Sequence, residues 1–165
     1  MTMYNKEGKT MNDHSNTNWN WSVTGVAIRE GKVLLARHTY GGGKGKWIIP
    51  GGYLENGESP EEAMKREFLE ETGVVAEPRD VIGIRCGEKN WYLAFRAEYI
   101  SGEARSDGDE NDAVEWMDIE EALGREDVPD LTKELVRCAL AGTGLTEITY
   151  STHHGGTLWG VENKR

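Results

Sequence analysis

The chain contains 165 residues, of which 37% are hydrophobic and 29% charged, and its formal net charge is −10. This length and composition predict one globular domain, and no apolar run approaches the ~18 residues of a membrane-spanning helix. The net charge argues against long nucleic acid as a partner, because its phosphates would be repelled. The first twenty residues lack an apolar signal segment, and two cysteines cannot form a disulfide framework, so we expect a cytoplasmic protein.

Charge is unevenly distributed along the sequence. Residues 103–127 hold eleven acidic residues against two arginines, and residues 55–71 hold seven glutamates against two basic residues. Residues 29–46 have the opposite balance, with five basic residues against one glutamate. Two acidic clusters and one basic strip suit a small phosphorylated ligand that arrives with a divalent metal, although solvated surface charge is the plainer alternative.

The residue patterns predict a mixture of strands and helices behind a flexible, polar arm at residues 1–18. Apolar and alternating runs predict strands over residues 22–29, 33–36, 47–49, 81–85, 91–99 and 113–117. Helical patterns lie at residues 60–72, 119–123 and 131–141. The first two strands should form a hairpin through Glu30-Gly31, and the tail from Gly142 another around Gly155-Gly156. One layered α/β or α+β domain is therefore expected.

The helix predicted over residues 60–72 has clear signals at both ends. Ser59 is a favourable N-cap residue, Pro60 stands at the first helical position, and Glu62 completes a capping box. Gly73 predicts the carboxyl end, because glycine readily adopts the left-handed conformation that ends many helices. This segment is the most firmly predicted helix of the chain.

Three glutamates of this helix, Glu67, Glu70 and Glu71, have the spacing i, i+3 and i+4 and so share one face. Like charges at this spacing repel one another, and a bound divalent cation would remove that repulsion. Because the nearby ligands are all oxygen atoms, Mg²⁺ is the expected ion, with Mn²⁺ as an alternative. The plain alternative is a glutamate-rich helix that faces solvent.

The residues around the three glutamates extend the pattern. Gly52 is followed after five residues by Glu58, and after seven more by the run Arg66-Glu-Phe-Leu-Glu-Glu-Thr-Gly-Val74. These positions match the signature of the Nudix hydrolases, which the chain resembles from Trp21 to about Ala141. The preceding run, Trp47-Ile-Ile-Pro-Gly-Gly52, is also similar to that family.

The resemblance implies an α/β fold, namely an α/β/α sandwich with a mixed β-sheet and a loop–helix–loop catalytic motif. The domain would span residues 19–142, with residues 143–165 as a carboxyl-terminal extension. Such enzymes hydrolyse a nucleoside diphosphate linked to another moiety, X, to a nucleoside monophosphate and phosphorylated X. The expected substrate is a small nucleotide, either a nucleoside triphosphate or an ADP-ribose-like nucleotide sugar, with no membrane partner. A Nudix-like module that senses nucleotide without turnover is the alternative, and a homodimer is left open.

The family's roles transfer to matching positions of this chain. The three helix glutamates would bind the metal, joined by the backbone carbonyl of Gly51 or Gly52. Glu58 and Arg66 match the pair that braces the loop against the helix. Members often add a later acid.

For that later acid we favour Glu115, on the predicted strand over 113–117, above Glu110 in the acidic loop over 101–112. A strand holds a carboxylate more firmly than a loop does. Candidates for substrate contact are Arg37 and Lys46 of the basic strip and the aromatic ring of Tyr53. The tail pair His153-His154 is a further, weaker candidate, because an exposed pair is the plainer explanation.

Overall fold

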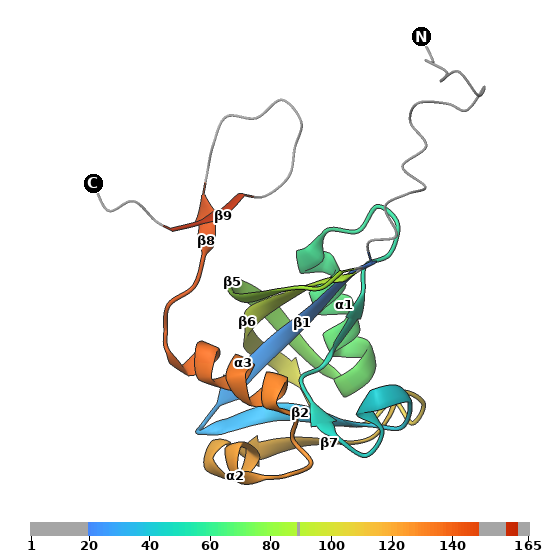
Figure 1. Cartoon of the computed structure of the whole chain (residues 1–165). Helices are drawn as coiled ribbons and strands as arrows, with labels where there is room; N and C mark the ends of the chain where they lie inside the picture. Colours follow the sequence, from blue (N-terminus) through green and yellow to red (C-terminus); the bar gives the residue numbers. More distant parts are fainter. Residues whose placement is uncertain (1–19, 89, 149–157, 162–165) are drawn as a thin grey trace, which may run out of the picture.

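The computed structural model describes residues 20–88, 90–148 and 158–161 (Figure 1). The predicted arm over 1–18, the pair His153-His154 and the turn at Gly155-Gly156 lie outside these residues. The strands are β1 (Asn20–Arg29), β2 (Lys32–His38), β3 (Trp47–Ile48), β4 (Gly51–Tyr53), β5 (Val74–Cys86), β6 (Asn90–Gly102), β7 (Asn111–Asp118), β8 (Thr146–Ile148) and β9 (Leu158–Gly160). The helices are α1 (Pro60–Thr72), α2 (Ile119–Gly124) and α3 (Asp130–Leu140), with a short 3₁₀ turn at Gly41–Gly43.

The main sheet is mixed and has β1 near its centre. Its strand order is β3-β2-β1-β6-β5, with β7 paired to β2 and β4 paired to β1. The pair β1–β6 is parallel, and the other pairs are antiparallel. β4 pairs with the first half of β1, at residues 22–24, and β2 pairs with its end, at residues 28–29. The segment before α1 is therefore held directly against the central strand.

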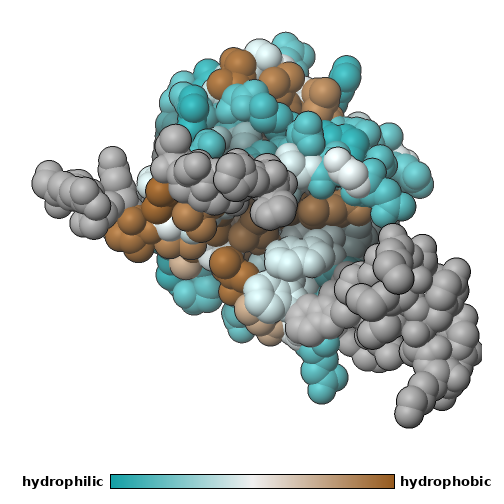
Figure 2. Space-filling model, turned by 90° about the horizontal axis from the view of Figure 1, so that it is seen from above, coloured by the Kyte–Doolittle hydropathy of each residue, from teal (hydrophilic) through white to brown (hydrophobic). Residues whose placement is uncertain are grey.

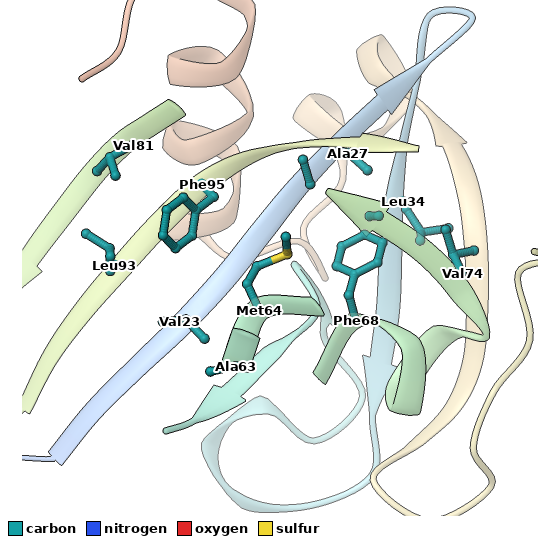
Figure 3. Close-up of a cluster of buried hydrophobic side chains, with 12 residues drawn as sticks. Val23, Ala27, Leu34, Ala63, Met64, Phe68, Val74, Val81, Leu93 and Phe95 are labelled. Atoms are coloured by element: carbon teal, nitrogen blue, oxygen red, sulfur yellow. The ribbon is translucent and has the colours of Figure 1, made fainter. Parts of the chain in front are cut away.

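Helices cover both faces of this sheet, which makes the α/β/α sandwich (Figure 1). On one face, Ala63, Met64 and Phe68 of α1 pack against a cluster that includes Val23 and Phe95 (Figure 3). On the other face, α2 and α3 contribute apolar side chains to a second buried cluster: Ala122, Leu135, Val136 and Ala139. Because β1 is covered on both sides, residues 22–27 are buried continuously rather than alternately.

The approach of α1 to the sheet depends on a glycine. A Cβ atom on Gly25 of β1 would lie 2.6 Å from the sulfur of Met64. The missing side chain lets the helix pack close to the central strand, and this fixes the depth at which the helix glutamates lie. Hydrophobic residues cross the middle of the face seen from above, with hydrophilic residues on both sides (Figure 2).

The predicted helix over residues 60–72 and the first predicted hairpin are confirmed. α1 begins after Ser59 with both bonds of the capping box and ends at Gly73, which is left-handed. β1 and β2 pair through the Glu30-Gly31 turn, where both residues have positive φ. In the tail, β8 and β9 pair antiparallel. Within the described part of the chain, none of the helices has the length and apolar character that a membrane crossing needs.

The strands differ from the prediction chiefly in the start of β5, the presence of β4 and the length of the acidic loop. β5 begins at Val74, directly after the helix cap, rather than at residue 81, because its first half pairs with the end of β6 through bulged registers. Gly51–Tyr53 forms β4 where the sequence predicts only an end to the preceding strand, because β1 offers it a partner. The acidic loop is correspondingly shorter, with β6 extending to Gly102 and β7 beginning at Asn111.

Candidate active site

An open pocket of about 470 Å³ lies beside α1. Several elements contribute to it: α1 with Arg66 and Glu67, β4 with Gly51, Gly52 and Tyr53, and the loop before β7 with Glu110. His38 and Tyr40, which follow one another closely at the end of β2, complete the opposite side. The pocket therefore lies where the segment before α1, the helix and the acidic loop meet.

Glycines let the backbone of β4 lie directly against the carboxylates of α1. A Cβ atom on Gly52 would lie 2.4 Å from the carboxyl group of Glu67. On Gly51 it would lie 2.1 Å from the carbonyl oxygen of Val23. No other residue type could bring this backbone so close to both the helix and the central strand.

Glu71 is a buried carboxylate with an incomplete set of partners. Its side chain is only 2% exposed, and the Gly51 amide donates to Oε2 at 3.2 Å. Its Oε1 is buried and has no hydrogen-bond partner among the described residues. Burial raises the pKa of Glu71 to about 8, and the charged groups that act most strongly on it, Glu67 and Glu110 among them, are acidic. Such a group favours either a proton or a cation.

Glu67 is the second carboxylate of the pocket. Burial raises its pKa above the ordinary value, and the negative charges of Glu70 and Glu110 act in the same direction. Arg66 opposes this shift by donating to Oε1 of Glu67 at 2.8 Å. The pocket thus gathers more negative charge than its one arginine compensates.

Arg66 braces the loop against the helix. It donates to both carboxylate oxygens of Glu58, at 2.8 and 2.9 Å, and these bonds lower the pKa of Glu58. It also donates to the carbonyl oxygen of Tyr53 at 3.1 Å and to Glu70 at 3.3 Å. One guanidinium therefore connects β4, the following loop and two helix carboxylates, as a planar fork of donors allows.

The acidic loop is anchored to the carboxyl end of α1. The buried Asn111 donates from Nδ2 to the carbonyl oxygen of Glu71 at 2.9 Å, and the Arg105 amide donates to the carbonyl of Thr72 at 2.8 Å. These bonds satisfy carbonyl groups that a helix end leaves without partners. They also bring Glu110, the residue before Asn111, to the pocket.

A second set of contacts holds Glu110 from the side of β2. The amide of Thr39 donates to the carbonyl oxygen of Glu110 at 3.0 Å. The hydroxyl of Tyr40 donates to Oε2 of Glu110, also at 3.0 Å. Burial and the bond to Glu110 raise the pKa of Tyr40 to about 12, so its hydroxyl stays a donor at neutral pH. Glu110 itself lines the pocket.

This geometry can be compared with known proteins. A model of the NUDIX domain family matches residues 19–137, which is most of the chain. The chain belongs to the Nudix hydrolase family. It is 33% identical to the phosphatase NudJ of Escherichia coli over 129 residues, which are 73% of this chain and 83% of that protein. It is 30% identical to an ADP-ribose pyrophosphatase of Methanocaldococcus jannaschii over 104 residues, which are 59% and 61% of the two chains.

Solved structures show the same fold. A NUDIX hydrolase from Nitrosomonas europaea superposes with a TM-score of 0.69 at 27% identity, covering 77% of this chain and 92% of that one. The sequence relatives differ in length, since this chain spans only 30% of a matching protein from Caenorhabditis elegans. The expected α/β fold of the Nudix hydrolases is thus confirmed.

The structure brings only part of the expected site together. Glu67, Arg66, Gly51 and Tyr53 line the pocket, and Glu58 and Glu71 bond directly to residues that line it. Glu70 lies at the edge, with a side chain that is 62% exposed and bonded to Arg66.

Glu115 is not brought to the pocket. It pairs directly with Leu35 of β2, and Leu35 belongs to the cluster under α2 and α3. Paired residues of an antiparallel ladder project to the same face, so Glu115 projects away from the α1 side. Glu115 is exposed, and its negative charge contributes to raising the pKa of Arg37. Glu110, the second choice from the sequence, lines the pocket instead.

The candidate residues of the basic strip, Arg37 and Lys46, also lie outside the pocket. Arg37 bonds to Asp112 at 2.6 Å and lies over the ring of Trp47, and Lys46 donates to the carbonyl oxygen of Glu126. Neither belongs to the lining of the pocket.

Sequence reasoning missed Tyr40 and Asn111, which position the acidic loop. Tyr40 could have been noticed because it directly precedes the glycine-rich residues 41–45, whereas nothing in the sequence marks Asn111.

The donor set fits a hard divalent cation. Among the described residues, no group of three or more His, Cys, Asp and Glu side chains lies close enough to hold a metal ion without rearrangement. The unpartnered Oε1 of Glu71 nevertheless lies in a region where Glu67 and Glu110 repel its charge. Carboxylate and carbonyl oxygens are the ligands that Mg²⁺ and Mn²⁺ prefer. A cation there would satisfy that oxygen and relieve the repulsion.

Proposed function

We propose that this chain is a metal-dependent pyrophosphohydrolase. It would cleave a nucleoside diphosphate linked to a moiety X into a nucleoside monophosphate and phosphorylated X. The observation that carries the proposal is the buried, uncompensated carboxylate of Glu71 beside a pocket lined by Glu67 and Glu110. Family membership and relatives named as an ADP-ribose pyrophosphatase and a phosphatase support the same reaction class.

We assign the metal to Glu67, Glu70 and Glu71, with the backbone carbonyl of Gly51 as a further ligand. Mg²⁺ is the proposed ion and Mn²⁺ its alternative. When bound, such an ion neutralises pyrophosphate charge and makes a coordinated water more acidic. Glu70 has an exposed side chain that is free to turn from Arg66 toward an ion, because an exposed pair is weak.

The chain's own residues position the reactants. Glu110, held by Tyr40 through one oxygen, can accept a proton from an attacking water at the other oxygen. Arg66 and Glu58 keep the β4 loop against the helix, so that the carboxylates keep their spacing. We favour a nucleoside triphosphate or an ADP-ribose-like nucleotide sugar as substrate.

The test is a screen over nucleoside triphosphates and nucleotide sugars, with MgCl₂, MnCl₂ or EDTA, in which the nucleoside monophosphate and phosphorylated X are detected by chromatography. We expect hydrolysis of at least one substrate that stops in EDTA and returns with metal. Full activity in chelator would contradict the metal assignment. Nucleotide binding without any turnover, measured by calorimetry on the same panel, would favour the sensing module.

A further inference from the structure

A second groove of about 440 Å³ adjoins the carboxylate pocket. The two share one wall, formed by Tyr53, Leu54 and Glu55. The remainder of the second groove is lined from the start of β1 and from the loop after β4, chiefly by Asn20, Trp21 and Asn56. Its size lies within the range of about 300–1,000 Å³ that small-molecule sites occupy.

Two aromatic side chains of this groove are exposed to solvent. Trp21 is 41% exposed and Tyr53 is 61% exposed. Their backbones are held on paired strands, because Ser22, next to Trp21, pairs with Tyr53, and the Leu54 amide donates to the carbonyl oxygen of Trp21 at 3.1 Å. Side chains alternate along a strand, so the two residues reach the groove from opposite faces of the sheet. The ring of Trp21 also contacts the ring of Trp91 in a tilted arrangement, with centroids 5.2 Å apart. Rigid exposed rings of this kind gain free energy when a flat apolar group covers them.

The polar lining of the groove indicates what kind of group would fit. Neither lysine nor arginine is among its described lining residues, and Glu55 is the charged one. A phosphate would meet no cation there and would be repelled by Glu55. The side-chain amides of Asn20 and Asn56 offer both donors and acceptors, which match the hydrogen-bonding edge of a nucleobase.

The groove is mechanically connected to the carboxylate pocket. Arg66, which donates to Glu67, also donates to the carbonyl oxygen of Tyr53 at 3.1 Å. The Glu55 amide donates to Glu58, the other partner of Arg66, at 3.0 Å. The shared wall is therefore fixed relative to the carboxylates, and a ligand can extend from one site into the other across Tyr53.

We propose that this groove binds the base of a nucleotide whose phosphates lie in the carboxylate pocket, with Trp21 and Tyr53 as stacking residues. The inference rests on the proposed function for the placement of the phosphates. It predicts that the enzyme discriminates against diphosphate compounds that lack an aromatic base, and that Asn20 and Asn56 select among bases.

The test measures binding without turnover. AMP, GMP, CMP and UMP contain no pyrophosphate bond, so each can be titrated into the protein with MgCl₂ by calorimetry, beside ribose 5-phosphate as the base-free probe. We expect at least one of the four to bind 10-fold or more tightly than ribose 5-phosphate. Trp21→Ala and Tyr53→Leu should each weaken that nucleotide by about 5- to 100-fold, the range of base–aromatic stacking, and leave ribose 5-phosphate unchanged.

Two variants control for folding. Trp21→Phe keeps a ring and should retain most of the nucleotide affinity. Leu131→Ala removes a side chain of α3 that is also 41% exposed, and it should bind as the wild type does. All variants are compared by thermal melting, and Tyr53→Leu remains informative if Trp21→Ala fails to fold.

The outcomes separate this inference from the proposed function. Equal binding of all four nucleotides and ribose 5-phosphate, or unchanged binding in folded Trp21→Ala and Tyr53→Leu, overturns the base site even if metal-dependent hydrolysis is found. Base-dependent binding that both variants abolish supports the site even if the hydrolysis screen is negative.

Discussion

The carboxylates on α1 and in the loop before it fall into two regions, one with a cationic partner and one without. On one side, Arg66 donates to Glu58, Glu67 and Glu70, so three acids share a single cation. On the other side, Glu71 is buried and accepts one hydrogen bond from an amide, and the charged groups that act on it are acidic. The residue types are the same, and Glu67, Glu70 and Glu71 belong to the same helix. The first region contains a positive partner, Arg66, which braces the loop against the helix, whereas the second has none among the described residues.

The difference shows that glutamates of one sequence motif can have separate structural and chemical roles, according to whether a cation lies beside them. A compensated carboxylate contributes stability and keeps its proton off, as the lowered pKa of Glu58 shows. An uncompensated buried carboxylate lowers stability. Such groups are typical of functional sites, where a bound ion or ligand supplies the missing partner. The predictions below test the two regions in turn.

The largest effect is expected at Glu71. Glu71→Gln keeps the shape of the side chain but removes the charge, so kcat should fall by roughly 10²-fold or more, as for loss of a strong electrostatic group. The same change should stabilise the metal-free protein at pH 8, because a buried charge is lost. Steady-state kinetics and urea unfolding measure both. Glu61→Gln, at the other end of α1, serves as the matched control and should alter neither.

Glu110 and Glu115 provide the next contrast. Glu110→Gln should lower kcat by about 10- to 10²-fold, in the range of a general base, because its carboxylate faces the pocket. Glu115→Gln should leave kcat near that of the wild type, because its side chain projects to the other face. Both are measured at saturating MgCl₂. A reversed order would show that the acidic loop rearranges when metal and substrate bind.

The brace should affect stability more than chemistry. Arg66→Met leaves Glu58 without its partner, at a cost of about 1–3 kcal/mol given that both side chains are partly exposed. In the double variant with Glu58→Gln, the loss should be smaller than the sum of the two single losses, because the charges interact. Urea midpoints of the four proteins form the double-mutant cycle. Additive losses would mean that the two side chains act independently.

The last test is a pH dependence of the metal-free protein, which does not involve catalysis. The folded-state pKa of Glu71, about 8, exceeds its ordinary value of 4.5, so the folded state holds more protons between these values. Stability from this group is therefore complete below pH 4.5 and is lost as pH rises toward 8, with a slope of at most about 1.4 kcal/mol per pH unit. Glu71→Gln should flatten the curve. Unfolding in EDTA across this pH range provides the measurement, and parallel curves for the two proteins would contradict it.

Local features of the sequence were enough to predict α1 and its motif. Ser59, Pro60 and Gly73 act on backbone groups within a few residues, so the ends of the helix could be predicted without knowledge of the fold. The i, i+3, i+4 spacing places Glu67, Glu70 and Glu71 on one face in any helix. The family signature then indicated the fold and the pairing of Glu58 with Arg66, which lie only eight residues apart.

Only the tertiary structure decided which distant residues join that helix. The choice between Glu110 and Glu115 depended on the register of β7 against β2 and on the bond from Asn111 to the end of α1. The strand pattern by itself does not say which face is covered by which helix. The unequal burial of Glu70 and Glu71, adjacent in sequence, likewise follows from how closely Gly25 and Gly51 let neighbouring backbone approach. Burial and long-range pairing are properties of the packed molecule, and they determine which of the acidic side chains is left without a partner.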